Sequence, residues 1–290
     1  MITVQAALAG ALIGGLYALM AAGLSVTWGV LRVINLAHFG LILVGAYLTY
    51  QLVSAWGFDP LVTVVVTAPL LFVAGAALQW VYDRLNIVEF NSLLVSFGLL
   101  MIAIQVATNV WTADFRRMAA RDNAYATGSV ELGGGLVLPT TTLLAFTFAV
   151  LIVGGGHVVL RTTFLGRGMR AFAQDRTVAA AFGIDHRRLG LVLGGVAGAS
   201  AAVAGMIFAL GNSLTPATAY EWFGTVFAVV ILGGVGNLLG TLLAGVGVGV
   251  LSGLVSVIWS PSTEPFALFL AIILALLLRP QGLFRRGGVA

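Results

Sequence analysis

The sequence contains no cysteine, and none of its 14 basic residues is a lysine. Without cysteine the chain can form neither a disulfide nor a thiolate metal site. Without lysine it cannot carry a P-loop ATPase, because the Walker A lysine contacts the β- and γ-phosphates of the nucleotide. If the protein uses ATP, the hydrolysis therefore belongs to another chain.

Charged residues are also scarce. They make up 8% of the 290 positions, while hydrophobic residues make up 60%. Soluble domains carry roughly 25% charged residues, so an ordinary soluble domain is excluded. Apolar stretches recur that are long enough to cross a hydrocarbon core of about 30 Å, and they are continuous, unlike the alternating segments of a transmembrane β-barrel. The sequence predicts one all-α, polytopic transmembrane bundle over residues 1–290.

The apolar stretches place the membrane spans. We place them near 4–28, 36–55, 60–82, 92–111, 139–160, 189–211, 222–236, 238–258 and 265–279. The "LGGVGNLLG" break leaves residues 222–258 open as two spans or as one span with a re-entrant segment, so 8–9 spans are expected. The N-terminal stretch lacks the basic n-region of a cleavable signal peptide, so we expect it to be a retained first span.

The arginines predict the orientation. Segment 161–188 holds six of them and the tail 279–286 holds three. Cytoplasmic loops of membrane proteins are enriched in arginine and lysine, and nine alternating spans then also place Arg32 and Arg84 inside. We therefore expect the N-terminus outside and the C-terminus in the cytoplasm, with only Arg116, Arg117 and Arg121 on the outer side.

Two segments outside the spans are long. Residues 112–138 are expected to form an external loop, in which a small hairpin surrounds the glycines of "AYATGSVELGGGLVL". Residues 161–188 are expected to form the large cytoplasmic loop. Within it, "GRGMRAFAQDRTVAAAFGI" has the pattern of an amphipathic helix. It is either a solvated basic loop that obeys the positive-inside rule or a helix that docks into a groove on a soluble partner.

The stretch "VLRVINLAHFG" places Arg32, Asn35 and His38 between two apolar runs. Polar residues at a helix break often satisfy freed backbone groups or lie among headgroups, and we assign Arg32 to this role as an interfacial anchor. Polar residues at membrane depth usually face the bundle interior. Asn35 and His38 are therefore candidates either for backbone satisfaction or for lining a pathway.

The fourth span carries a second polar group, formed by Asn91, Ser92 and Ser96. These residues lie roughly on one helical side, so they either line a pathway or form hydrogen bonds between helices. Glycine runs such as "GGVGNLLG" and "AGVGVGV" predict packing faces, because small residues let membrane helices approach closely. With no cysteine and three scattered histidines, no metal site is expected.

Four stretches together resemble the branched-chain amino acid permease family of ATP-binding-cassette importers, on its LivH-like side. They are "GLYALMAAGLSVTWGVLRVINLAHFGLILVGAYL", "RAFAQDRTVAAAFGID", "VVILGGVGNLLGTLLAG" and "LLLRPQGLFRR". They extend from near the N-terminus to near the C-terminus, so the resemblance covers essentially the whole chain. Each stretch alone is only weakly specific for the family, whereas the combination of the four is more specific.

The resemblance implies a bundle of the ABC importer permease type, without catalysis and in a bacterial inner membrane. Such a subunit pairs with a second permease, expected to be a different chain, with two cytoplasmic ATPase subunits and with an external solute-binding protein. ATP and magnesium are bound by the ATPases, and this chain binds the lipid bilayer but no cofactor and no nucleic acid. The resemblance also implies a coupling segment at Gly166, Arg167, Arg170, Phe172, Asp175, Ala179, Phe182, Gly183 and Ile184, with Gly183 at the glycine of an EAA-like pattern.

The resemblance adds to the interpretation of the stretch "VLRVINLAHFG". Asn35, Ala37 and His38 match the family's Asn-x-Ala-His pattern, but Phe39 and Gly40 stand where many relatives carry a glycine and an acidic residue. We therefore expect a small solute that is more apolar or more acidic than a simple amino acid. The class considered is branched-chain or hydrophobic amino acids, amides and small organic acids. The candidate pathway residues are Asn35, His38, Phe39, Asn91, Ser92 and Ser96.

Two other classes of protein remain as alternatives. A stand-alone secondary transporter coupled to sodium or protons usually needs carboxylates within the membrane. All ten acidic residues of this chain fall in loops or at span ends, although backbone carbonyls could still hold sodium. A membrane-embedded enzyme would need a clustered acid, base and nucleophile, and the sequence has none.

Overall fold

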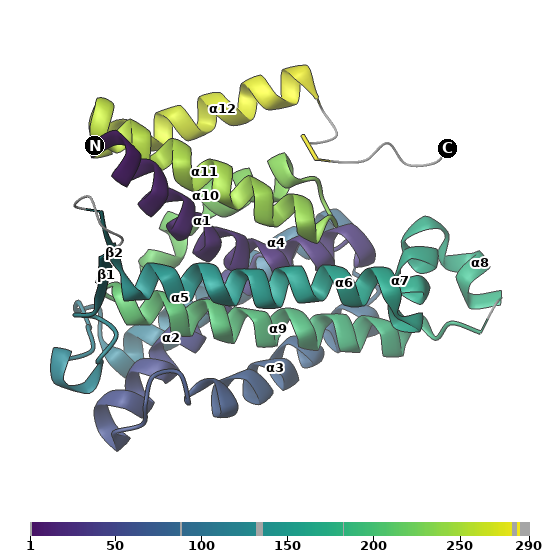
Figure 1. The fold of residues 1–290 in the computed structure, drawn as a ribbon. Helices are drawn as coiled ribbons and strands as arrows, with labels where there is room; N and C mark the ends of the chain where they lie inside the picture. Colours follow the sequence, from purple (N-terminus) through teal and green to yellow (C-terminus); the bar gives the residue numbers. More distant parts are fainter. Residues whose placement is uncertain (1, 88, 132–135, 182, 280–282, 285–290) are drawn as a thin grey trace.

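The computed structural model describes residues 2–87, 89–131, 136–181, 183–279 and 283–284. They form a bundle of long helices with one small hairpin at one end (Figure 1). The helices are α1 (Ile2–Val26), α2 (Ala37–Trp56), α3 (Val64–Arg84), α4 (Glu89–Trp111), α5 (Thr140–Ala149), α6 (Gly155–Thr162), α7 (Phe164–Gln174), α8 (Arg176–Ala181), α9 (His186–Gly211), α10 (Thr218–Gly233), α11 (Leu238–Ile258) and α12 (Glu264–Leu278). The short elements are η1 (Thr27–Leu31), η2 (Ala120–Asp122), η3 (Val150–Gly154), η4 (Pro261–Thr263), β1 (Ser129–Glu131) and β2 (Val137–Pro139).

The predicted all-α membrane bundle is confirmed. Eight helical stretches of the described chain are long and apolar enough to cross a membrane, and α5, η3 and α6 form one of them. The remaining predicted span, 222–236, corresponds to α10, which has 16 residues. Just before α10, Leu214 and Arg116 form an isolated antiparallel β-bridge. Near the end of α10, the Leu232 carbonyl accepts a hydrogen bond from the Leu283 N–H. Region 222–258 therefore contains a short helix and a long one.

Glycines bring α1 and α11 into backbone contact. A Cβ on Gly249 would overlap the Gly10 carbonyl oxygen and lie 2.7 Å from the Gly14 Cα. A Cβ on Gly245 would lie 2.6 Å from the Gly14 carbonyl oxygen. The four-residue spacing of these glycines is the small-xxx-small pattern of membrane helix pairs, so the packing face predicted from "AGVGVGV" is confirmed.

Helix α9 forms the centre of the bundle, and its glycines also allow close backbone contact with neighbouring helices. It packs against α1, α2 and α3, and most of its residues from Leu189 to Leu210 are buried. A Cβ on Gly198 would overlap the Leu71 carbonyl of α3, and one on Gly205 would overlap the Ile42 carbonyl of α2. These close contacts hold α2, which follows the polar break, and α3 against the centre of the bundle.

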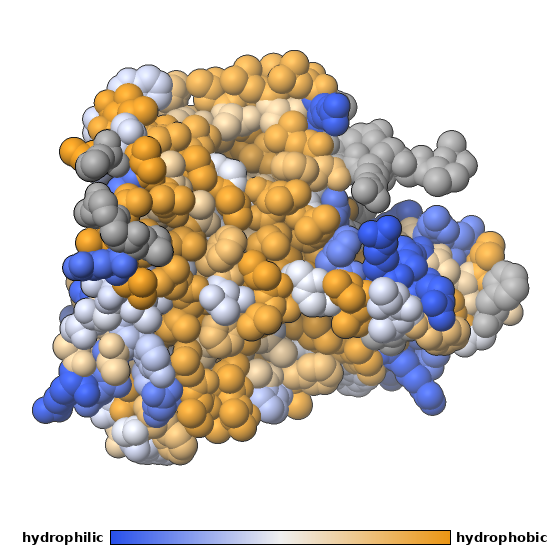
Figure 2. Space-filling model, viewed as in Figure 1, coloured by the Kyte–Doolittle hydropathy of each residue, from blue (hydrophilic) through white to orange (hydrophobic). Residues whose placement is uncertain are grey.

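The polar surface is concentrated at the two ends of the bundle, with an apolar band between them (Figure 2). At one end β1 and β2 pair antiparallel, which confirms the predicted hairpin; its glycines 133–135 lie outside the described residues. At the other end α7 and α8 extend beyond the long helices (Figure 1). The chain starts at the hairpin end, and α12 finishes toward the α7–α8 end.

Candidate functional site

The first helix does not connect smoothly to the second. Its last turn widens into the π-turn η1, and Arg32 then adopts the left-handed conformation with φ 55° and ψ 38°. Residues 32–36 are not helical, and α2 begins at Ala37. A π-bulge is often found at functional sites, and a left-handed residue commonly ends a helix. The backbone groups released at this break need partners other than those of a regular helix.

Two serines of α4 provide these partners. Ser92 Oγ accepts a hydrogen bond from the Ile34 N–H at 3.2 Å, and Ser96 Oγ accepts one from the Leu36 N–H at 2.9 Å. The Ser96 hydroxyl in turn contacts the Ile34 carbonyl at 3.1 Å. Both side chains are fully buried. The serines therefore form hydrogen bonds between segments, which is one of the two roles considered for them, and they attach the break to α4.

Asn35 and His38 lie at the same place with different partners. The Tyr82 hydroxyl donates a hydrogen bond to Asn35 Oδ1 at 3.2 Å. His38 Nε2 lies 3.0 Å from the Met20 carbonyl of α1. Because a carbonyl can only accept, Nε2 carries the hydrogen. His38 Nδ1 is buried without a hydrogen-bond partner among the described residues. Gly23 makes room for this imidazole, since a Cβ there would overlap the ring.

The fully buried Phe39 ring faces α10. Its centroid lies 4.6 Å from that of Phe223 and 6.2 Å from that of Phe227, and Trp28 of η1 contacts Phe227 at 6.1 Å. The sequence prediction missed these α10 aromatics, although phenylalanines four residues apart on an apolar helix would have indicated them. The break is thus closed toward α10 by an aromatic cluster.

The structure brings five of the six candidate pathway residues together at the break. They are Asn35, His38, Phe39, Ser92 and Ser96. The sixth, Asn91, is exposed on the surface of α4. Asn91 and Ser92 are consecutive, and consecutive residues of a helix point about 100° apart, so one can be buried while the other faces outward.

A cavity of about 610 Å³ lies on the hairpin side of the break, and no residue of the break lines it. It lies among α1, α5, α9, α10 and α12, and Met20, whose carbonyl lies against His38, forms part of its wall. Its wall contains two carboxylates, Glu221 and Glu264. The Ser252 and Ser256 hydroxyls of α11 donate hydrogen bonds to Glu264. The sequence predicted all acidic residues in loops or at span ends and did not assign these two glutamates to a site.

Loss of the Ser96 hydroxyl is expected to weaken the break. In Ser96→Ala the Leu36 N–H would be buried without its partner, at a cost of about 1–3 kcal/mol in unfolding free energy. The matched control is Ser54→Ala, because Ser54 is exposed near the end of α2. Thermal unfolding of the purified protein in detergent measures both variants. Equal melting temperatures would show that the Ser96 bonds do not hold the break.

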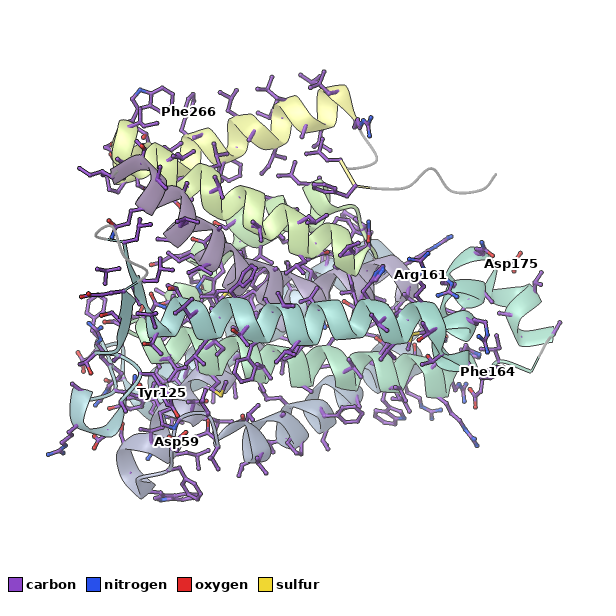
Figure 3. All side chains as sticks on the ribbon, in the orientation of Figure 1. Asp59, Tyr125, Arg161, Phe164, Asp175 and Phe266 are labelled. Atoms are coloured by element: carbon purple, nitrogen blue, oxygen red, sulfur yellow. The ribbon has the colours of Figure 1, made fainter. Side chains whose placement is uncertain are left out.

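The predicted coupling segment is amphipathic in the structure. The Thr163 side chain caps α7 by accepting a hydrogen bond from the Gly166 N–H at 3.2 Å. Met169, Phe172 and Ala179 are buried against the bundle. On the opposite side the exposed residues include Arg167, Arg170 and Asp175, and Figure 3 shows Asp175 far from the labelled Tyr125 and Asp59 at the other end.

A left-handed glycine connects this segment to α9. Gly183 has φ 81°, its N–H donates to the Ala180 carbonyl, and the Ile184 N–H donates to the Ala179 carbonyl. Asp185 then caps α9 by accepting from the Arg188 and Arg187 N–H groups. These bonds, together with the nearby positive charges, lower the pKa of the Asp185 carboxyl. Phe182, the remaining member of the predicted coupling segment, lies outside the described residues.

Comparisons with known proteins identify the family of this chain. The profile of the family described as "Branched-chain amino acid transport system / permease component" matches residues 6–278. The high-affinity branched-chain amino acid transport system permease protein LivH of Salmonella typhimurium is 26% identical over 300 residues, covering 96% of this chain and 94% of the relative. BraD of Pseudomonas aeruginosa, with the same description, is 25% identical over 292 residues, with the same shares of both chains.

A more distant organism contributes a further relative. The probable branched-chain amino acid transport permease protein LivH of Methanocaldococcus jannaschii is 26% identical over 261 residues, which cover 86% of this chain and 80% of the relative. No solved structure matches the chain. Because the family profile extends over nearly its entire length, the chain belongs to the family of permease components of branched-chain amino acid transport systems.

Proposed function

We propose that this protein is a transmembrane permease subunit of an ATP-binding-cassette importer that moves a small organic solute into the cell. The family match carries the proposal. The amphipathic α7–α8 segment supports it, because it extends beyond the bundle with charged residues outward, as a docking element for a soluble partner would. The chain performs no catalysis on this proposal, and partner ATPases bind ATP and magnesium.

The proposed orientation places the α7–α8 end in the cytoplasm. Arg161, Arg167 and Arg170 lie at that end, and Arg279 follows α12, which also finishes there. Arginine is enriched in cytoplasmic loops. The N-terminus and residues 112–138 then face the outside, and residues 161–188 form the cytoplasmic loop of a protein in a bacterial inner membrane.

The proposed assembly has five or more chains. Two ATPase subunits dock on the cytoplasmic segments of this permease and of a second, different permease, and an external solute-binding protein delivers the solute at the hairpin end. Closure of the ATPases moves α7 and α8 and rocks the bundle between outward-open and inward-open states. The break at residues 32–36 lies next to the moving segment, because Val33 shares an apolar cluster with Met169 and Phe172 of α7.

The proposed solute belongs to the class of branched-chain or hydrophobic amino acids, amides and small organic acids. The relatives are named for branched-chain amino acid transport. In this chain Phe39 is buried in an aromatic cluster, and Glu221 and Glu264 are the carboxylates that the described part of the chain contributes to the cavity wall. The proposed lining residues are Asn35, His38 and Phe39, while Ser92 and Ser96 hold the break in place.

The test is to purify the protein from its native membrane and to identify its partners by mass spectrometry. Two ATPase chains with Walker A motifs, a second permease and a solute-binding protein are expected, and the binding protein can then be screened for ligands. Ion-driven uptake by the isolated chain in liposomes, without any ATPase, would instead support a secondary transporter.

Substitution of the proposed lining residues is expected to change transport without changing docking. In Asn35→Ala and His38→Ala we expect uptake of the solute found by the screen to fall by about tenfold, the effect of removing one to two buried polar interactions. Both variants should retain their ATPase subunits, because the substituted residues lie away from the outer face of α7. Unchanged uptake by both variants would assign these residues to structure alone.

A further inference from the structure

The α7–α8 segment rests on the least regular part of the bundle. The buried Met169 and Phe172 belong to the same apolar cluster as Leu31 and Val33, the residues on either side of Arg32. Phe172 is 4% exposed and Leu31 is 4% exposed. Helix α7 is therefore in packing contact with η1 and the break, where few helical hydrogen bonds hold the backbone.

A polar contact joins the same two elements. Nη2 of Arg32 lies 3.5 Å from the Ala173 carbonyl in the last turn of α7. A cation is favoured at that position, because the carbonyl end of a helix carries partial negative charge. The break is consequently attached to α7 through Arg32 and to α4 through Ser92 and Ser96.

Tyr82 contacts both the apolar cluster that packs against α7 and the Asn35 side chain in the break. It lies in the last turn of α3, it is 2% exposed, and its ring belongs to the cluster that contains Phe172 and Leu31. Its hydroxyl donates to Asn35 Oδ1. Among the buried residues described in this cluster, Tyr82 is the one with a polar side-chain atom.

The packing around this tyrosine leaves room for movement. A cavity of about 510 Å³ is lined by Phe172, Leu31, Val33 and Tyr82, together with residues of α9 and the end of α3. Protein interiors are otherwise close-packed and resist displacement. This cavity opens to the surface between exposed Arg32, Asn86 and Arg187, so Phe172 has space beside it on the side of Tyr82.

We propose that Tyr82 is the positioning residue that transmits movement of α7 to Asn35. This inference rests on the proposed function, in which partner ATPases move α7. When Phe172 and Leu31 shift, the Tyr82 ring shifts with them, and its hydroxyl changes the position of the Asn35 amide. The coupling is carried by packing at one side of the ring and, at the other, by the hydrogen bond from the hydroxyl to Asn35, beside Ser96, with which the same hydroxyl also interacts.

The test uses the natural absence of cysteine from this chain. A single cysteine at Ala37, a buried residue two positions after Asn35, reports the state of the break through its rate of modification by N-ethylmaleimide. The purified complex with its ATPases is labelled with and without ATP and vanadate, which trap the closed ATPases. We expect trapping to change the labelling rate in the parent A37C protein.

In Tyr82→Phe with A37C, we expect the trapping-dependent change in labelling to fall by about fivefold, the factor that a net buried hydrogen bond contributes. The rate of ATP hydrolysis should remain within about twofold of the parent rate, because α7 itself is unaltered. Tyr50→Phe is the matched control, since Tyr50 lies in the half of α2 that is remote from the break. It should retain the full change.

Two further variants keep the test interpretable if Tyr82→Phe alone folds poorly. Asn35→Ala removes the acceptor of the same bond and should give the same loss. Phe172→Ala should also reduce the response, and adding Tyr82→Phe should not reduce it further, because changes along one route are not additive. A full response in Tyr82→Phe or Asn35→Ala, additive losses, or no trapping-dependent change in the parent would each overturn the inference. Absence of ATPases from the purified parent would instead contradict the proposed function.

Discussion

Gly249→Val is expected to leave little correctly assembled protein in the membrane. A Cβ at this position overlaps the Gly10 carbonyl oxygen and approaches the Gly14 backbone to 2.7 Å. Backbone cannot rotate away as a flexible side chain can, so α1 and α11 must separate. We expect a destabilisation of about 3 kcal/mol or more, at or beyond the upper end of the usual overpacking range.

The matched control for this substitution lies two residues away on the same helix. Gly247 is exposed, and a Cβ there has nothing within 4 Å. Gly247→Val introduces the same side chain and the same loss of glycine without a collision. Size-exclusion profiles and melting temperatures in detergent compare the two variants. Equal behaviour would show that the close approach of α1 and α11 does not determine stability.

On the proposed function, Gly183→Val is expected to uncouple the permease from its partner ATPases while the bundle still inserts. Gly183 has φ 81°, and a Cβ there has no neighbour within 4 Å. The penalty is therefore conformational, about 1–2 kcal/mol for a residue with a Cβ in the left-handed region and more for a branched one. The turn between α8 and α9 would open, and we expect ATP-driven uptake to fall by about tenfold.

Asparagine distinguishes backbone strain from any other effect at this position. Asn adopts the left-handed conformation more readily than other non-glycine residues, so Gly183→Asn should retain most of the uptake. Uptake and ATPase co-purification are measured for both variants in the same membranes. Normal uptake by Gly183→Val with its ATPases present would remove residues 166–184 from the coupling role.

The fold could be predicted from the sequence because its main determinant is local. Each apolar block is continuous, so its length alone identifies a span, and the glycine spacing of α11 identifies its contact face. The hairpin was predictable from the glycines and strand-forming residues around it. The amphipathic pattern of α7 likewise identified its buried side, which includes Met169 and Phe172.

The candidate site could be predicted only in part, because its partners are distant in sequence. Ser96 bonds the backbone of Leu36, sixty positions away, and a backbone acceptor or donor leaves no mark in the sequence. The contact of Tyr82 with Asn35 is equally non-local. Nothing in the residue types of "TWGVL" indicates a π-turn, because this conformation depends on how α1 packs against its neighbours.

The shortness of α10 affects the membrane around it. Sixteen helical residues extend about 24 Å, which is less than the roughly 30 Å of a typical hydrocarbon core. A helix shorter than the bilayer thins it locally or draws polar ends inward. The segment 211–217 before α10 would therefore lie deeper than the neighbouring loops. On the proposed function, a solute released there would cross several ångströms less of apolar barrier before it reached Phe223 and the break.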